Sequence, residues 1–326
     1  MKTIQIPHEI EMVRQYDPCL RASCVSPDGR WCLFQDEDLP KVTMWSIEEG
    51  KVSRSFQIEN DRSIMGGTKK FISASFSRDG HFVIAGGYGG RVCIWNRDTG
   101  ELVESIIDGV HAYLGYVMSA AIDGNNKIML VGAMYGAFVF KLFRAELIVH
   151  FKKHSGQVNS IAFTPDEKHA VSASADETVR IWEVLSGHQS KVFHQADLDR
   201  NDPYGNFANT VTVSRDGKRV LSGGSSKLLW LWNSRKTDEP VFVLRGHESD
   251  IWIAQLSSDG YWGVSGSRSE TICWNLRDGS QIVKLENCTN PVILPDEEHL
   301  IANTPAGPCL WKLYFKAKTQ NLMFKP

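Results

Sequence analysis

The chain has 326 residues, of which 42% are hydrophobic and 23% charged, and this composition is typical of a globular protein rather than a disordered, collagen-like or membrane-spanning one. Its 36 basic and 38 acidic residues nearly balance, which argues against a nucleic-acid-binding protein. The seven cysteines include no CxxC pair, so we expect no disulfide framework, no zinc site and a cytoplasmic location.

The N-terminal segment mixes charged and apolar residues and lacks the apolar core of a signal peptide. No stretch of the chain approaches the roughly 18 consecutive apolar residues that suggest a membrane-spanning helix. We therefore expect no contact with a membrane.

A polar turn with an aspartate near its centre then recurs seven times. Asp-Gly and Pro-Asp pairs suit tight turns, because aspartate bonds its own backbone and glycine accepts a positive φ. The aspartates are Asp28, Asp79, Asp123, Asp166, Asp216, Asp259 and Asp296, at intervals of 37 to 51 residues. Six of them are followed, 15 to 17 residues later, by Trp45, Trp95, Trp182, Trp232, Trp274 and Trp311. In the third unit Phe140 or Leu142 must take the place of the tryptophan.

The fourth unit shows most clearly what each repeat contains. Four runs with alternating or β-branched character are separated by turns, at Val158–Phe163, His169–Ser174, Thr178–Trp182 and Lys191–His194. This pattern predicts antiparallel strands. No segment has the capped 3.6-residue period of a helix.

One four-stranded unit cannot bury both of its faces, whereas seven units stacked around an axis can. We therefore predict a single all-β domain over 1–326, a seven-bladed β-propeller with four antiparallel strands per blade. The predicted blades cover residues 16–58, 68–108, 114–152, 154–196, 206–245, 247–286 and 288–326, the last together with 3–15.

These motifs resemble the WD40-repeat family, and the resemblance covers nearly the whole chain. The fourth unit carries it best, through His154-Ser155-Gly156, Thr164-Pro165-Asp166 and the run from Ser174 to Trp182. The sixth unit carries it through Gly246-His247 and Thr271-Ile272-Cys273-Trp274. The resemblance implies a propeller without catalytic activity that binds other proteins.

The resemblance also implies a hydrogen-bonded set inside a blade, formed here by His154, Ser174, Asp176 and Trp182. We expect these four residues to be structural, because a buried aspartate needs donors that a histidine and a hydroxyl can supply. Other units depart from the pattern. The position of the aspartate holds Gly89 in the second unit, Ser226 in the fifth and Ser269 in the sixth.

The ring must also close, so that no edge strand is left to aggregate. In the related family the N-terminal strand often becomes the outer strand of the last blade. We expect Glu9–Gln15 to do so here, with Gln320–Lys325 as the competing segment.

The sequence contains no clear catalytic or metal site. His150 and His154 are four residues apart, but a zinc pair at that spacing needs a helix, and this segment is a strand followed by a loop. Gly86–Gly90 does not open a helix and so cannot offer a helix N-terminus to phosphate. We expect no catalytic residue, no metal and no cofactor, and we interpret Lys312–Lys318 as a strand with one solvated edge.

One face of the ring is the expected binding surface. It carries the loops between blades and the turns between second and third strands, and in WD40 proteins it commonly holds the partner. Extra chain at 57–70 and 194–206 belongs to this face. The family's usual contact positions fall on Arg21, Lys70, Tyr88, Tyr116, Met118, Tyr135, Asn159, Phe207, Asn209, Asp250, Trp252 and Arg268.

This set is rich in aromatic residues and arginine, which are enriched at binding hot spots. We therefore predict a non-catalytic scaffold or adaptor, a monomeric propeller within a complex, that grips a segment of a partner protein on this top face. Two alternatives remain open. One is a constitutive subunit that uses its blade sides, and the other is an enzyme with a site at the central channel.

Overall fold

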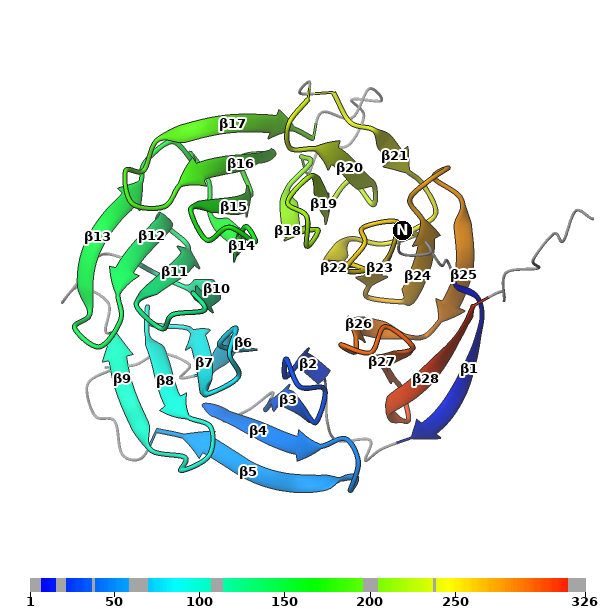
Figure 1. Ribbon diagram of the computed structural model, residues 1–326, viewed down its shortest axis with the longest axis horizontal. Helices are drawn as coiled ribbons and strands as arrows, with labels where there is room; N and C mark the ends of the chain where they lie inside the picture. Colours follow the sequence, from blue (N-terminus) through cyan, green and yellow to red (C-terminus); the bar gives the residue numbers. More distant parts are fainter. Residues whose placement is uncertain are drawn as a thin grey trace, which may run out of the picture.

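The computed structural model describes residues 7–15, 22–36, 39–58, 70–106, 114–195, 205–236 and 239–315. These residues form 28 strands and contain no helix. The strands make seven four-stranded antiparallel sheets, which stand around a central axis like the blades of a propeller (Figure 1). The predicted seven-bladed fold is thus confirmed.

The first four blades follow one another along the chain. Blade one contains β2 (Ala22–Val25), β3 (Trp31–Gln35), β4 (Lys41–Ser46) and β5 (Lys51–Gln57). Blade two contains β6 (Phe71–Phe76), β7 (Phe82–Gly87), β8 (Val92–Asn96) and β9 (Leu102–Ile106). Blade three contains β10 (Val117–Ile122), β11 (Ile128–Ala133), β12 (Gly136–Lys141) and β13 (Glu146–Phe151). Blade four contains β14 (Val158–Phe163), β15 (His169–Ser174), β16 (Thr178–Glu183) and β17 (Gln189–His194).

The remaining three blades complete the circle. Blade five contains β18 (Ala208–Val213), β19 (Arg219–Gly224), β20 (Leu229–Asn233) and β21 (Phe242–Leu244). Blade six contains β22 (Ile251–Leu256), β23 (Trp262–Ser267), β24 (Glu270–Asn275) and β25 (Gln281–Glu286). Blade seven contains β26 (Thr289–Ile293), β27 (His299–Thr304) and β28 (Gly307–Phe315), together with β1 (Pro7–Gln15).

The N-terminal strand closes the ring, as predicted. β1 pairs antiparallel with β28, so that the outermost strand of blade seven comes from the beginning of the chain. Figure 1 shows β1 and β28 side by side although they are the first and last strands in sequence. The competing segment, Gln320–Lys325, lies outside the described residues.

The recurring tryptophan holds the same place in every blade that has one. Trp182 on β16 pairs with Ala170 on β15, and Phe140 on β12 pairs with Met129 on β11 in the same register. Phe140, rather than Leu142, therefore takes the tryptophan position in blade three.

The tryptophans join neighbouring blades. The ring of Phe151, at the end of β13, stacks on Trp182 of blade four with the centroids 4.7 Å apart. Phe193 stacks in the same way on Trp232 of blade five, at 5.0 Å. In these blades the tryptophan is buried against the neighbouring blade, so each unit depends on the next one for part of its core.

One turn differs from its predicted alignment. The N–H of Asp123 donates to the carbonyl of Ile128, as the N–H of Thr164 donates to His169. Asp123 therefore occupies the position of Thr164 and not that of Asp166. The carboxylate of Asp123 accepts the N–H groups of Lys127 and Ile128. In blade one a hydroxyl, that of Ser26, accepts the corresponding N–H of Trp31. The aspartate of the third unit is therefore displaced by two residues from the aspartates of the other units.

Among the described residues, no helix has the length and apolar character needed to cross a membrane.

Candidate functional site

A chain of hydrogen bonds runs through the interior of blade four. Nδ1 of His154 lies 2.7 Å from the carboxylate of Asp176, and Nε2 lies 2.7 Å from the hydroxyl of Ser172. The same hydroxyl accepts the indole N–H of Trp182 at 2.8 Å. His154, Asp176 and Trp182 thus form the expected set, but its hydroxyl comes from Ser172.

Ser174, which was predicted to belong to this set, has a different role. Its hydroxyl donates to the carbonyl of Gly156 and accepts the N–H of Asp176, so it shapes the turn that follows β15. Ser172 and Ser174 lie on the same face of the strand, because side chains alternate with a period of two. The register of Trp182 against β15 selects Ser172, and the motif alone did not reveal that register.

Blades five and six carry versions of this set that sequence reasoning missed. In blade six, His247 bonds Ser265 and Glu270, and Ser265 accepts the indole N–H of Trp274. Glu270, one residue after the expected Ser269, bonds Nδ1 of His247 as Asp176 bonds Nδ1 of His154, because its side chain is one methylene longer. In blade five, the amide of Gln195 donates to Ser222 where a histidine would stand.

The ionisation of these groups follows from their surroundings. Burial lowers the pKa of His154 and of His247, so both imidazoles are neutral near pH 7. Burial alone would raise the pKa of Glu270, but hydrogen bonds from Ser269, the N–H of Glu248 and His247 outweigh it and lower the pKa to about 2. The pKa of Asp176 likewise lies well below its usual range.

These polar groups are not arranged for chemistry. The side chains of His154 and His247 have no exposed surface, so a substrate cannot reach them. Burial raises the pKa of the Cys93 and Cys273 thiols to about 12, which keeps them protonated at neutral pH. Each set instead connects the strands and the turn within one blade.

The wall of the central channel is made by the innermost strands β2, β6, β10, β14, β18, β22 and β26 (Figure 1). These strands belong to separate sheets and are connected by side chains. Ser75 donates to the carbonyl of Ala120, 2.9 Å away in the next blade. Such bonds fix each innermost strand relative to its neighbour and make the channel mouth a rigid frame.

A cavity of about 920 Å³ occupies one mouth of this channel. Seven predicted contact residues line it, and they come from five blades: Lys70, Tyr88, Met118, Asn159, Asn209, Trp252 and Arg268. The ring therefore brings together residues that are as many as 198 positions apart in the sequence, from Lys70 to Arg268.

Two aromatic groups dominate this mouth. Trp252 is 42% exposed, and the guanidinium of Arg268 lies over its ring, 5.4 Å from the centroid. On blades two and three, Tyr88 and Tyr116 pack edge to face with their centroids 4.9 Å apart, and both remain more than a third exposed. Large aromatic surfaces held in place in this way are suited to burying a partner's side chains.

Other predicted contact residues lie away from the cavity lining or cannot be placed. Tyr116, Tyr135, Phe207 and Asp250 do not line the cavity, although the first three expose large parts of their rings. Arg21 lies outside the described residues, as does most of the extra chain at 57–70 and 194–206.

Two asparagines of the lining, Asn159 and Asn209, bond neighbouring blades. The amide of Asn159 donates to the carbonyl of Ala208 and to the side chain of Asn209. Asn209 is buried and donates to the carbonyl of Ile251. Their amide groups are thus used to join blades four, five and six, and they offer a partner little more than the floor of the cavity.

Sequence reasoning missed several polar residues of the lining, among them Ser73. The hydroxyl of Ser73 on β6 is buried, and within the described part of the chain it has no hydrogen-bond partner. Ser119, at the equivalent position of β10, exchanges hydrogen bonds with Ile161 in the next blade. A buried hydroxyl without a partner is costly, so Ser73 is a place where a bound polar group would gain a bond.

Comparisons with known proteins agree with this architecture. The family model described as WD domain, G-beta repeat matches residues 61–96, 145–183 and 238–274. The chain is 24% identical over 257 residues to a guanine nucleotide-binding protein subunit beta of Arabidopsis thaliana, which covers 74% of this chain and 66% of that protein. It is 29% identical over 170 residues to a serine-threonine kinase receptor-associated protein of Dictyostelium discoideum, which covers 51% of each chain.

A subunit beta of Zea mays is also 24% identical, over 65% of its length. The chain thus spans slightly less than two thirds of the length of these beta subunits.

Proposed function

Since the chain belongs to the WD40-repeat propeller family, we propose that it is a non-catalytic scaffold that binds a segment of a partner protein in the cavity at the channel mouth. The observation that carries this proposal is the exposed aromatic surface at the cavity, where Trp252 with Arg268 and Tyr88 line it and Tyr116 packs against Tyr88. We name these four residues the mouth cluster.

The mouth cluster suits a protein segment for physical reasons. Its side chains are carried by strand ends and turns of a rigid ring, so little conformational entropy is lost when a partner binds. Exposed tryptophan, tyrosine and arginine are the residues most enriched at binding hot spots. Arg268 has no carboxylate partner in the described part of the chain and is oriented to pair with a carboxylate or phosphate of the partner.

The wider setting follows from the same proposal. The protein acts in the cytoplasm as one propeller within a larger complex, and its partners are proteins rather than nucleic acids or membranes. The six described cysteines are all unpaired, which supports a reducing compartment. The names of two relatives, a subunit of a guanine nucleotide-binding protein and a receptor-associated protein, describe proteins that work together with others.

The proposal is tested by co-purification from native lysate, followed by reconstitution with the partner so identified. Trp252→Ala and Tyr135→Ala remove exposed rings from the top face. Leu185→Ala is the matched control, because Leu185 is 65% exposed but lies on the turn between β16 and β17. With equal melting temperatures, we expect Trp252→Ala to weaken binding of the purified partner at least about tenfold. Unchanged affinity of Trp252→Ala would contradict the proposal, whatever Tyr135→Ala does, because Tyr135 does not line the cavity.

A further inference from the structure

Each of the first six blades has a β-bulge on its innermost strand, at the mouth of the channel that holds the cavity. The pairing of the first two strands shifts by one residue in each blade, and the extra residues are Ser23, Ile72, Met118, Asn159, Asn209 and Trp252. All six line the cavity. A bulge re-aims a side chain and is frequent beside functional sites. We call these six the bulge residues.

The polar bulge residues hold neighbouring blades together. The hydroxyl of Ser23 donates to a backbone carbonyl of blade two, 3.2 Å away. The amides of Asn159 and Asn209 donate to carbonyls of blades five and six, at 3.0 and 3.2 Å. The polar groups of these three residues are therefore used within the fold.

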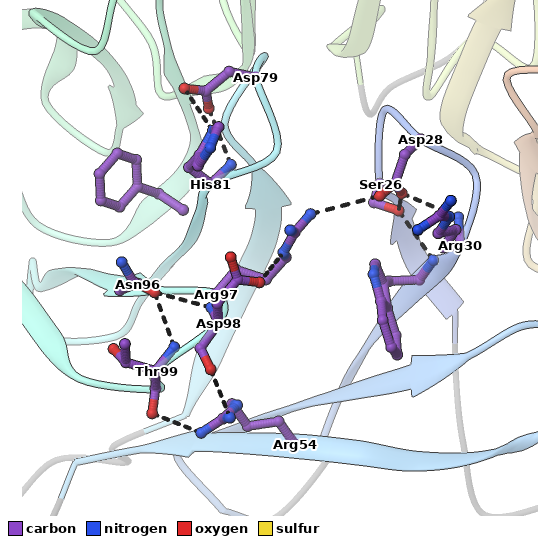
Figure 2. Close-up of polar contacts among 12 residues, drawn as sticks. Ser26, Asp28, Arg30, Arg54, Asp79, His81, Asn96, Arg97, Asp98 and Thr99 are labelled. Atoms are coloured by element: carbon purple, nitrogen blue, oxygen red, sulfur yellow. Dashed lines mark hydrogen bonds and ion pairs between the residues drawn. The ribbon is translucent and has the colours of Figure 1, made fainter.

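The apolar bulge residues have no group that could make such a bond, and their blades are joined to neighbouring blades elsewhere. On the face opposite the cavity, Arg54 of blade one donates to the carbonyls of Asp98 and Thr99 in blade two, 2.7 and 2.6 Å away (Figure 2). In the same way the side chain of Gln255 in blade six accepts the N–H of Ile293 in blade seven at 2.7 Å. The apolar bulge residues thus line the cavity without a polar role in the fold.

Two apolar bulge residues are continuous with the paired tyrosines of the mouth cluster. The N–H of Tyr88 donates to the carbonyl of Lys70, two residues before Ile72. The ring of Tyr88 packs on that of Tyr116, two residues before Met118, with the centroids 4.9 Å apart. We call Ile72, Tyr88, Tyr116 and Met118 the apolar arc. Aromatic rings and methionine adapt well to an aliphatic side chain.

The third apolar bulge residue, Trp252, stands beside the charge that the cavity offers. Trp252 and Arg268 belong to blade six, whose strand β22 lies across the central opening from β6 and β10 (Figure 1). The charged residues of the lining are Asp36, Lys70 and Arg268. The first two have opposite charges and interactions of their own. In the described part of the chain Arg268 contacts the ring of Trp252 and no carboxylate, so the lining has one positive charge in excess.

From this arrangement, and resting on the function proposed above, we propose that the partner segment is both acidic and apolar. It places an aspartate or glutamate against Arg268 and an aliphatic side chain on the apolar arc. A single guanidinium forms two parallel hydrogen bonds with one carboxylate, whereas phosphate groups are usually bound by clusters of arginines. The proposal therefore states which residues a partner must contain, beyond the statement that it is a protein.

A phage-displayed library of random peptides, about 12 residues and so about 40 Å long when extended, tests this inference. Peptides are kept if they bind the wild type and do not bind Trp252→Ala, with equal melting temperatures of the two proteins. We expect the kept peptides to share an acidic residue at a constant distance from an aliphatic one. Selection on Arg268→Glu should replace the acidic residue by lysine or arginine.

The selection separates this inference from the function on which it rests. If no peptide depends on Trp252, the proposed function itself is contradicted. If the kept peptides depend on Trp252 but share no acidic residue, the proposed function stands and only the present inference is overturned.

One kept peptide with a fluorescent label is then measured by anisotropy in a double-mutant cycle. Arg268→Gln, and glutamine in place of the acidic residue of the peptide, should each weaken binding at least about tenfold. Both changes together should weaken it no more than either alone, because they remove the same pair. Arg245→Gln is the matched control, because Arg245 is exposed, follows β21 and does not line the cavity. Losses that multiply would overturn the inference, as would tighter binding of a peptide with phosphoserine at the acidic position.

The apolar arc is tested with the same peptide. Met118→Asn gives blade three the residue that blades four and five carry at this bulge, as Asn159 and Asn209. Met12→Asn is the matched control, because Met12 is 50% exposed on the outermost strand of blade seven. We expect Met118→Asn to weaken binding at least about tenfold and Met12→Asn to leave it unchanged. Equal binding of Met118→Asn and the wild type would overturn the role of the arc.

Discussion

Replacing the hydroxyl of Ser172 tests how much the buried hydrogen bonds inside blade four contribute to stability. Because His154 is neutral and its Nδ1 faces the carboxylate of Asp176, Nδ1 carries the proton and Nε2 must accept one. The hydroxyl of Ser172 donates to that Nε2, and its oxygen accepts the indole N–H of Trp182. One oxygen atom thus satisfies two buried nitrogens.

Ser172→Ala leaves both nitrogens unpaired in a place that water cannot reach. A buried polar group without a partner costs about 1–3 kcal/mol. Two such groups, less some relaxation, lead us to expect a loss of about 2–4 kcal/mol in the free energy of unfolding. Ser174→Ala is the matched control, because its partners lie in the turn beside solvent, and we expect a loss of about 1 kcal/mol.

Urea unfolding followed by circular dichroism measures both variants under identical conditions. The reasoning requires Ser172→Ala to be the more damaging of the two. It would be refuted if Ser172→Ala unfolded like the wild type, or if Ser174→Ala lost as much stability. Asp176→Ala removes the carboxylate that accepts the Nδ1 proton of His154, at the other end of this series of hydrogen bonds. It should lower the free energy of unfolding by about 3–5 kcal/mol.

Substitutions at Glu270, Glu167 and Gly224 test other parts of the fold. Glu270→Gln should flatten the pH dependence of unfolding between pH 4.5 and about 2, since the lowered pKa of Glu270 gives stability that is present above pH 4.5 and lost as the pH falls; unchanged acid sensitivity would contradict this. Glu167→Ala should lower the free energy of unfolding in urea by about 1 kcal/mol, because the carboxylate accepts the N–H of Gly124 and pairs with Arg78. Glu167→Gly should lower it less, because glycine adopts the backbone φ of 57° without strain. Gly224→Ala should lower the free energy of unfolding by about 3 kcal/mol or more, because the added Cβ would lie 1.6 Å from the carbonyl oxygen of Phe207. Gly246→Ala, whose Cβ would have its nearest neighbours 3.2 Å away, is the control and should lose less stability. Thermal unfolding of the two variants under the same conditions measures the difference.

Much of the fold could be predicted because each repeat contains residues that favour a tight turn at the same place. In blade four the first two predicted strands, Val158–Phe163 and His169–Ser174, coincide with β14 and β15. Their bounds are set by Thr164, whose hydroxyl donates to the carboxylate of Asp166, and by Asp166, which accepts the N–H of Lys168 in the turn. Local hydrogen bonds of this kind can be recognised from neighbouring residues alone.

The details that escaped prediction depend on contacts between distant segments. Ser172, and not Ser174, accepts the indole N–H of Trp182. Glu270, and not Ser269, bonds the imidazole of His247, and Gln195 donates to the hydroxyl of Ser222 in place of a histidine. The channel mouth is harder still to predict, because whether Asn209 offers its amide to a partner or to Ile251 depends on the position of the next blade.

The same comparison of registers shows that the two halves of the ring are built differently. The hydroxyl under the tryptophan occurs in blades four, five and six as Ser172, Ser222 and Ser265, and the equivalent positions of blades one, two, three and seven hold Phe34, Ala85, Val131 and Ala302. Blades form with a serine or with an apolar residue at this position, so the fold requires neither.

The outermost strands allow a similar comparison. Leu102 and Leu147 are exposed and lie opposite the tryptophan position. Glutamine already serves at this position in blades four and six, so Leu102→Gln/Leu147→Gln should change the free energy of unfolding by no more than about 0.5 kcal/mol. Ser172→Ala should do the opposite, because it lowers stability while leaving the exposed side chains of the outer strands and of the mouth cluster in place. A large loss of stability in the leucine variant would mean that Leu102 and Leu147 are part of the fold despite their exposure.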